Sequence, residues 1–168
     1  KRQRNADVGL LLLGVVQALL AARVMARLWR TRRGESIAPA TDPGDTSQQV
    51  TVLLPVLDEE RRLAPALEGL IAQGEEVRAI LVIDGGSCDG TRAVVERYAA
   101  RDDRITWLAA PEAPPEANGK AWQLAYGVER NDDATPWLLT IDADVRPAPL
   151  LVRSLLRHAD RTGVRALS

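Results

Sequence analysis

From Val50 onward, short continuous apolar runs alternate with longer stretches in which apolar residues recur at helical spacing. The continuous runs predict four buried strands, over residues 50–55, 79–84, 105–109 and 137–142. The helical spacing predicts four helices, over residues 59–73, 91–100, 119–130 and 148–159. Strands that alternate with helices in this way indicate an α/β domain with a doubly wound, mostly parallel sheet and right-handed crossovers.

The first 33 residues follow a different pattern, in which one segment is apolar on all sides. Its uncharged part, residues 8–22, is shorter than the roughly 20 residues that cross a bilayer. Extension to Trp29 supplies the length if Arg23 and Arg27 reach towards the lipid headgroups. We therefore expect residues 1–33 to form a transmembrane anchor helix; a cleaved signal peptide and an interfacial helix are the alternatives.

Basic residues are more frequent after this apolar segment than before it. That asymmetry predicts a cell-membrane protein, single-pass or multi-pass, whose folded domain is cytoplasmic. Residues 34–49 are polar and rich in Pro, Gly, Ser and Thr, which is typical of a linker. Residues 50–168 then form the folded domain.

Charge and cysteine content narrow the classes of partner and site. Lys and Arg number 22 against 23 Asp and Glu, a formal net charge of -1, which argues against a nucleic-acid partner. The single Cys88 excludes an internal disulfide and a multi-cysteine zinc site. The sequence also lacks a P-loop, a G-x-G-x-x-G fingerprint and a G-x-S-x-G elbow.

Asp142 and Asp144 form the sharpest candidate for chemistry, because they follow an apolar strand with one residue between them. Two carboxylates where the chain leaves a strand can approach one hard divalent ion, Mg²⁺ or Mn²⁺, which also binds phosphate oxygens. Such an ion stabilises a departing diphosphate. A solvated turn is the alternative interpretation.

Three further segments place polar residues after predicted strands or at a helix start. Asp84 ends the second strand before Gly85 and Gly86, where it could accept a hydrogen bond from a nucleobase; capping alone is the alternative. Asn118-Gly119-Lys120 opens a helix, where Lys120 could meet phosphate or simply be exposed. Since ligands bind beyond the carboxyl ends of such strands, the polar groups at the three strand ends, residues 55–59, 84–87 and 142–144, are expected to share one edge of the sheet.

Pro55 closes the first strand, and Asp58 and Glu59 open the helix that follows. Acidic residues suit the positive end of a helix, so capping is the simplest role for them. Contact with a nucleoside is the functional interpretation. Pro65 lies inside the predicted helix and is expected to kink or delay it.

These four segments, in this order over about residues 50–165, resemble the family 2 glycosyltransferases of the GT-A fold, a Rossmann-like nucleotide-diphospho-sugar transferase fold. The combination is far more specific than any one segment. The positions that match the family's motifs are Pro55, Asp58, Glu59, Asp84, Gly86, Ser87, Asp89, Gly90, Thr91, Asn118, Gly119, Lys120, Asp142 and Asp144. One departure is Gly85, where many family members have a second Asp.

The resemblance implies transfer of a sugar from a nucleotide-diphosphate sugar, a UDP-sugar, with inversion. Mn²⁺ or Mg²⁺ would assist, and the acceptor would be a hydroxyl of a lipid, a carotenoid-like alcohol or a glycan at the membrane. Pro55, Asp58, Glu59 and Asp84 would form the nucleoside side of the donor site, with Lys120 near the base or diphosphate. Asp142 would contact the ribose or the metal, and Asp144 would ligate the metal.

In this family a carboxylate acts as the general base that deprotonates the acceptor. That residue lies well after the D-x-D motif in the sequence. No suitable carboxylate motif follows Asp144 here, so the base is expected beyond residue 168 and residues 1–168 alone are expected to be inactive. Two alternatives remain open. A sugar-phosphate nucleotidyltransferase would need a glycine-rich loop after the first strand, and a non-catalytic membrane-anchored nucleotide-binding domain would need only the fold.

Overall fold

A computed structural model describes residues 14–27, 29, 37–41, 48–131 and 135–167. The chain divides into two units, Lys1–Ser36 and Ile37–Ser168. In the first unit, residues 14–27 are helical and their side chains are exposed. None of the helices that the structure describes is both long enough and apolar enough to cross a bilayer. The rest of the expected anchor, residues 1–13, 28 and 30–33, lies outside the described residues.

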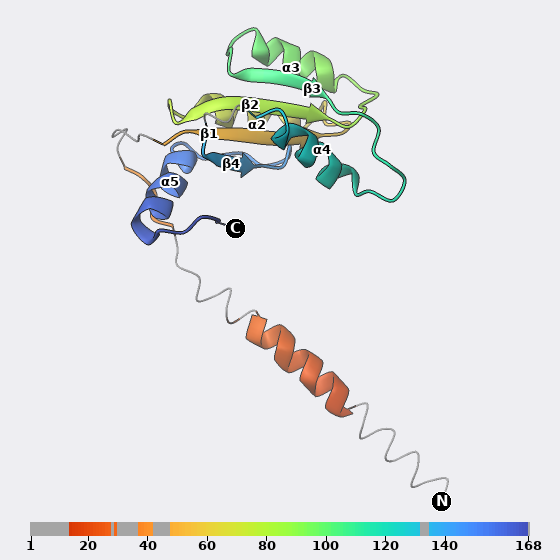
Figure 1. The fold of residues 1–168 in the computed structure, drawn as a ribbon, viewed down its shortest axis with the longest axis vertical. Coiled ribbons are helices and arrows are strands. Elements are labelled where there is room, and N and C mark those ends of the chain that lie inside the picture. Colours follow the sequence, from red (N-terminus) through yellow and green to blue (C-terminus); the bar gives the residue numbers. More distant parts are fainter. Residues whose placement is uncertain (1–13, 28, 30–36, 42–47, 132–134, 168) are drawn as a thin grey trace, which may run out of the picture. The chain divides into compact units, whose positions relative to one another are not determined.

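The second unit is built on a parallel sheet. Within its described residues, four strands lie in the order β3-β2-β1-β4, and every pairing is parallel. Figure 1 shows their arrows running in one direction, so that all strands end at the same edge. The strands are β1 (Val50–Val56), β2 (Val77–Asp84), β3 (Ile105–Ala109) and β4 (Trp137–Thr140).

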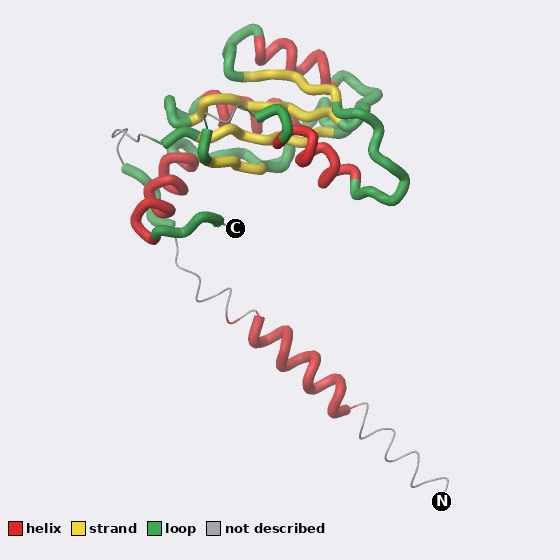
Figure 2. The backbone as a smooth tube through the Cα atoms, viewed as in Figure 1, coloured by secondary structure: helices red, strands yellow, loops and turns green. Residues whose placement is uncertain are grey.

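Helices cover both faces of this sheet, as the doubly wound pattern predicts. Figure 2 separates the sheet from the helices and loops around it. The larger apolar cluster joins one sheet face to three helices, and the smaller cluster joins the opposite face to the fourth. The first three helices are α2 (Leu63–Ile71), α3 (Thr91–Ala99) and α5 (Leu151–Thr162), and the fourth is α4 (Gly119–Val128).

The sequence of the interior strand β1 shows no alternation of polar and apolar residues. All of its residues are buried, because helices cover both faces of the sheet at this position. On the α4 side the helix approaches closely at Gly127. A Cβ on Gly127 would lie 2.4 Å from Ile83 Cδ1, so a larger residue there would push α4 away from the sheet.

The observed elements follow the predicted ones, with differences that have local causes. The first helix begins at Leu63 rather than at residue 59, because Asp58 has a φ of 53° and turns the chain before the helix. Pro65 consequently falls in the first turn of α2, where a missing N–H costs little. The fourth strand ends at Thr140, although Ile141 N still donates to Leu53 O at 3.1 Å.

Parts of the segment expected to be a linker contact the domain. Ala40 N donates to Ser154 Oγ on α5 at 2.9 Å. Gln48 accepts a hydrogen bond from the indole N–H of Trp137 on β4. Residues 37–41 and 48–49 therefore run along the folded unit, and residues 42–47 lie outside the described part.

Candidate functional site

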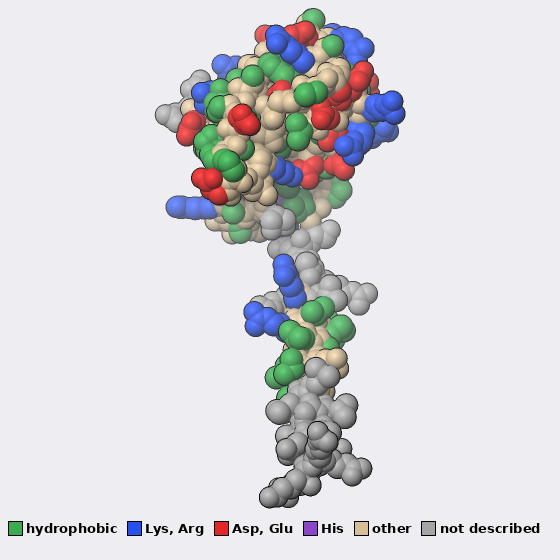
Figure 3. Space-filling model, turned by 90° about the vertical axis from the view of Figure 1, so that its right-hand side faces the viewer, with side chains coloured by type: hydrophobic (Ala, Val, Ile, Leu, Met, Phe, Trp, Pro, Cys, Tyr) green, Lys and Arg blue, Asp and Glu red, His purple; other side chains and the backbone are tan. Residues whose placement is uncertain are grey.

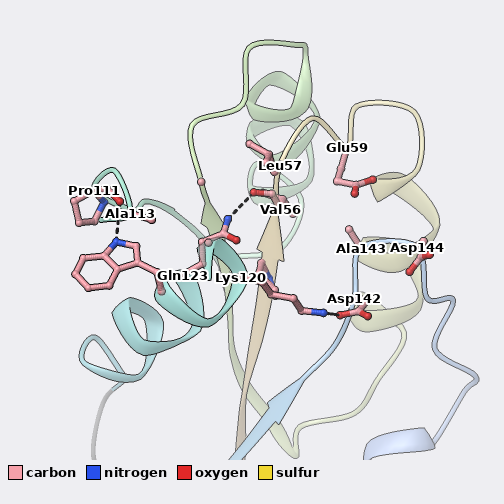
Figure 4. A pocket seen from close by; sticks show the side chains of 14 residues that line it. Val56, Leu57, Glu59, Pro111, Ala113, Lys120, Gln123, Asp142, Ala143 and Asp144 are labelled. Atoms are coloured by element: carbon pink, nitrogen blue, oxygen red, sulfur yellow. Dashed lines mark hydrogen bonds and ion pairs between the residues drawn. The ribbon is translucent and has the colours of Figure 1, made fainter. Parts of the chain in front are cut away.

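A cleft of about 370 Å³ opens at the edge where the strands end. It lies beyond β1 and β4, where the strand order reverses, because β1 has β2 on one side and β4 on the other. Open α/β sheets bind ligands at such switch points. The lining residues come from four segments (Figure 4): Pro55, Val56, Leu57 and Glu59; Gly85; Pro111, Ala113, Gly119, Lys120, Trp122 and Gln123; and Asp142, Ala143 and Asp144.

One end of the cleft is charged. Lys120 Nζ forms an ion pair with Asp142 Oδ1, and the two side chains point toward one another in Figure 4. These side chains remain 53% and 56% exposed, and Asp144 in the same turn is also exposed. The turn is closed by Val145 N, which donates to Asp142 O at 3.1 Å. The D-x-D carboxylates and the lysine are thus brought together as the sequence predicted, and all three are open to solvent.

Glu59 lies at the same edge and lines the cleft from the β1 side. Its carboxylate pairs with Arg62, with Arg62 Nε 2.9 Å from Glu59 Oε2. Glu59 Oε2 nevertheless accepts no well-aligned hydrogen bond from the residues that the structure describes. This oxygen is shielded from solvent, so the ion pair with Arg62 is what balances its charge in the structure.

The other end of the cleft is apolar. Pro111 and Ala113 lie on the far side from Asp142 and Asp144 in Figure 4. Trp122 Nε1 donates to Pro111 O at 2.9 Å, which fixes this loop to α4. Leu57 is 55% exposed although it is a large apolar side chain. Apolar surface left open beside a polar site is typical of a ligand pocket.

Gln123 is a cleft residue that the sequence reasoning missed. It is buried on α4, and its Nε2 donates to Val56 O at 2.7 Å and to Ile83 O at 3.0 Å. These carbonyls belong to the ends of β1 and β2, so Gln123 ties the helix to both strands. The available signal was a polar residue on the sheet-facing side of a predicted helix.

Asp84 and Asp58, both expected in the donor site, do not line the cleft. Asp84 is buried, and both of its carboxylate oxygens accept from Ser87 N, at 3.1 and 3.2 Å; Oδ1 also accepts from the Ser87 hydroxyl. Asp58 N donates to Ser87 Oγ at 2.9 Å, and Cys88 N donates to Asp58 Oδ1 at 2.7 Å. The structure uses both carboxylates to shape the turns after β1 and β2.

The same two turns are joined again one residue further on. Glu60 N donates to Asp89 Oδ2 at 3.1 Å, and Gly90 N donates to Glu60 Oε2 at 3.2 Å. Glu59 N donates to Thr91 Oγ1 at 2.8 Å. The hydrogen bond from the Thr91 hydroxyl lowers the pKa of Asp89. Because the turns brace each other, Glu59 is held at the cleft by its backbone.

The donor set at the charged end fits a hard divalent cation that shares its coordination with a ligand. No group of three or more His, Cys, Asp or Glu suited to a metal occurs in the described part of the chain. Mg²⁺ in particular is commonly held by one or two carboxylates together with substrate phosphates and water. Asp142 and Asp144, exposed in one turn, match that arrangement.

The edge of the domain that carries the cleft has mixed charge. Figure 3 looks onto the edge where the strands end and shows acidic and basic side chains interspersed with apolar ones. The fold and the cleft together define a doubly wound α/β domain with a ligand site at its switch point. The chain belongs to glycosyl transferase family 2, because that family's model matches residues 51–167.

Curated relatives cover parts of the domain. The lipopolysaccharide core biosynthesis glycosyltransferase LpsC of Rhizobium meliloti (strain 1021) is 33% identical over 90 residues, 54% of this chain and 29% of that protein. The 4,4'-diaponeurosporenoate glycosyltransferase of Staphylococcus haemolyticus (strain JCSC1435) is 29% identical over 105 residues, 61% of this chain and 26% of that protein. The chain thus spans less than a third of the length of these relatives.

Solved structures share the fold. The mannosyltransferase PcManGT from Pyrobaculum calidifontis, in complex with GDP-Man and Mn²⁺, matches with a TM-score of 0.58 and 24% identity, over 84% of this chain and 42% of that one. Glucosyl-3-phosphoglycerate synthase from Mycobacterium tuberculosis, in complex with Mn²⁺, UDP and glucosyl-3-phosphoglycerate, matches with a TM-score of 0.50 and 24% identity, over 68% and 43%. These likenesses confirm the expected GT-A-like, parallel α/β fold.

Proposed function

We propose that the protein containing this chain transfers a sugar from a UDP-sugar to an acceptor hydroxyl with inversion. The observation that carries the proposal is the cleft itself. Lys120, Asp142 and Asp144 are exposed at one end, and an apolar wall that includes Pro111 and Ala113 closes the other. A nucleoside diphosphate has the same division, with a flat base at one end and concentrated negative charge at the other. Membership of glycosyl transferase family 2 supports this choice of ligand.

The two ends of the cleft would bind different parts of the donor. The base would lie against the apolar wall, with Pro55 and Glu59 near the nucleoside. Lys120 would exchange its ion pair with Asp142 for the diphosphate, because both side chains are exposed and an exposed pair is weak. Asp58 and Asp84 would contribute by fixing the turns that carry these groups.

Asp142 and Asp144 would hold a divalent cation, Mn²⁺ or Mg²⁺, together with diphosphate oxygens. When bound there, the cation supplies charge neutralisation for the departing nucleoside diphosphate. Both similar structures described above contain Mn²⁺, which supports a metal at the corresponding end of this cleft.

The acceptor hydroxyl would attack the anomeric carbon from the face opposite the leaving diphosphate. The relatives' names refer to lipopolysaccharide core biosynthesis and to a diaponeurosporenoate, which supports a lipid, carotenoid-like or glycan acceptor. We assign the general base to a part of the protein outside residues 1–168. Accordingly, residues 1–168 alone should show no turnover, and robust transfer by them would contradict this assignment.

We further propose that residues 1–33 anchor the domain at the cytoplasmic face of the cell membrane. The apolar segment and the arginines that follow it support this placement. Carbonate extraction of membranes checks it: the protein should stay in the pellet. Release into the supernatant would contradict the anchor and leave the donor site unaffected.

Titration calorimetry of UDP against the full-length natural protein tests the donor site. We expect binding in the presence of Mn²⁺, and a loss of about 100-fold or more when the metal is omitted or when Asp144→Ala is introduced. Arg130→Ala, a charge removal just beyond α4 and outside the cleft lining, is the control and should bind UDP normally. Absence of UDP binding would favour a non-catalytic domain, and preference for a nucleoside triphosphate would favour a nucleotidyltransferase.

A further inference from the structure

Gln123 is the one polar side chain of the described cleft lining that is both buried and set between the apolar wall and the strand ends. The charged side chains of the cleft lie at the opposite end, towards Asp142 and Asp144 (Figure 4). A polar group in an apolar environment orients a ligand strongly, because an unmatched partner there is costly.

The amide of Gln123 has a fixed orientation. Both hydrogens of Nε2 have partners, since Nε2 donates to Val56 O at 2.7 Å and to Ile83 O at 3.0 Å. Among the described residues, no group donates to Gln123 Oε1, and this oxygen is not sealed from solvent. In Figure 4 the oxygen lies on the side of the amide away from the Val56 carbonyl. Gln123 therefore offers the cleft a hydrogen-bond acceptor and no donor.

Gly85 makes room for this arrangement. A Cβ on Gly85 would lie 2.6 Å from Gln123 Nε2 and 3.0 Å from its Cδ. Any other residue at position 85 would displace the amide or break its hydrogen bonds to the strand ends. Gly85 also lines the cleft, and the amide of Gln123 occupies the space that its missing side chain leaves. The glycine and the glutamine thus form one structural unit.

We propose that Gln123 Oε1 accepts a hydrogen bond from the ring N–H of the donor's base, and so selects uracil over cytosine. This inference rests on the proposed function, since it assigns the base end of the same donor site. Uracil carries a hydrogen on N3, whereas cytosine has a bare acceptor nitrogen at that position. Asp84 is the competing acceptor, but its carboxylate is buried and bound to Ser87, and it does not line the cleft.

Nucleotides alone provide the first test, without any substitution. Calorimetry with the full-length natural protein and Mn²⁺ should show UDP binding at least about tenfold tighter than CDP or N3-methyl-UDP. The methylated nucleotide keeps the diphosphate and carries a methyl group in place of the N3 hydrogen, and CDP removes the same donor without adding a methyl group. Equal affinities for UDP, CDP and N3-methyl-UDP would overturn the inference.

Substitutions then identify the acceptor. Gln123→Met has a similar length and no acceptor oxygen, so it should bind UDP and N3-methyl-UDP equally. Asp84→Asn should retain the tenfold preference for UDP. The reverse pattern, with the preference lost in Asp84→Asn and kept in Gln123→Met, would overturn the assignment. Each result is a ratio of the affinities of two nucleotides for the same variant. A partial loss of folded protein affects both affinities equally and leaves the ratio unchanged.

Failure of the inference is distinguishable from failure of the proposed function. If UDP and CDP bind equally and both require Mn²⁺ and Asp144, the donor site stands and the role of Gln123 is wrong. If no nucleoside diphosphate binds with Mn²⁺, the proposed function itself is wrong, and the role of Gln123 falls with it.

Discussion

The two edges of the sheet use ion pairs in opposite ways. At the edge where the strands begin, Glu76 and Arg153 form a pair at 2.7 Å, with side chains 0% and 7% exposed. At the edge where the strands end, Lys120 and Asp142 form a pair with side chains more than half exposed. The same chemistry is thus enclosed by the fold at one edge and open to solvent at the other.

The enclosed pair belongs to the attachment of α5. Gln73 Nε2 donates to Ala148 O at 3.0 Å, and Val152 N donates to Gln73 Oε1 at 3.2 Å. Together with Glu76 and Arg153, these contacts join the helix to the turn before β2. Removing one partner of a buried pair leaves an uncompensated charge away from water. The enclosed pair therefore contributes to stability, and its two charges are not exposed to a ligand.

The open pair has the reverse properties. Lys120 and Asp142 can each interact with water instead of with one another. Their mutual attraction therefore contributes little to the free energy of unfolding. For the same reason either member can turn to a ligand at low cost. In this domain, exposure therefore separates the charges proposed for binding from those used for folding.

The largest expected effect is from Arg153→Leu. This substitution leaves Glu76 buried without its cation and should lower the free energy of unfolding by about 3–5 kcal/mol, measured by urea denaturation. Arg157→Leu, one turn further along α5 and exposed, is the matched control and should cost much less.

A double variant separates charge from packing at this edge. Glu76→Leu combined with Arg153→Leu removes both charges and should recover much of the stability lost by Arg153→Leu alone. Equal costs for Arg153→Leu and Arg157→Leu would show that the buried pair is not what holds α5.

The second-largest expected effect is on the affinity for UDP and not on the stability of the fold. Lys120→Ala should change the free energy of unfolding by less than about 0.5 kcal/mol but weaken UDP binding about tenfold, which is about 1.4 kcal/mol. Calorimetry and urea denaturation on the same protein measure both quantities. A loss of stability above about 1 kcal/mol with unchanged UDP binding would mean that Lys120 stabilises the fold and does not bind the ligand.

Hydrophobic periodicity was enough to predict the sheet and its helices. The third strand was predicted with the observed bounds, Ile105–Ala109, because a short apolar run between turn residues has few alternatives. The start of α2 was placed too early, since the positive φ of Asp58 depends on contacts with Ser87 and Cys88. Those contacts join residues about 30 positions apart, which no local pattern records.

The candidate site was predicted in part for a similar reason. Lys120, Asp142 and Asp144 meet because strand ends and a helix start share one edge of a parallel sheet. The dependence of Gln123 on Gly85 could not be read in advance, because it arises from the distance between α4 and β2. A base contact of Asp84 stays a prediction; the structure adds that Ser87, in the turn that follows the two glycines, donates to its carboxylate.

The third-largest expected effect depends on pH. It concerns Asp102 and Arg104, a part-buried ion pair at the edge where the strands begin. The side-chain hydrogen bond from Arg104 holds the pKa of Asp102 below its ordinary value of 3.8. The stability that this pair provides is therefore present above that ordinary value and is lost as the pH falls through the lower, folded-state pKa.

Asp102→Asn should accordingly cost about 1 kcal/mol near neutral pH, and the difference from the natural protein should shrink as the pH falls below about 4. Urea denaturation across a pH series measures it. Asp103→Asn, the exposed neighbour, is the control and should follow the natural protein. A cost for Asp102→Asn that is independent of pH would mean that the lost contact is not ionic.

The smallest expected effect comes from an exposed pair outside the cleft lining. On α3, Arg92 Nε lies 2.7 Å from Glu96 Oε1, and the side chains are 69% and 58% exposed. Glu96→Gln should lower the free energy of unfolding by less than about 0.5 kcal/mol, and 1 M salt should abolish even that difference. This pair has the exposure of Lys120 and Asp142 but no cleft beside it. A cost well above 1 kcal/mol here would show that exposure does not separate folding charges from binding charges, and the small stability effect expected for Lys120→Ala would lose its physical basis.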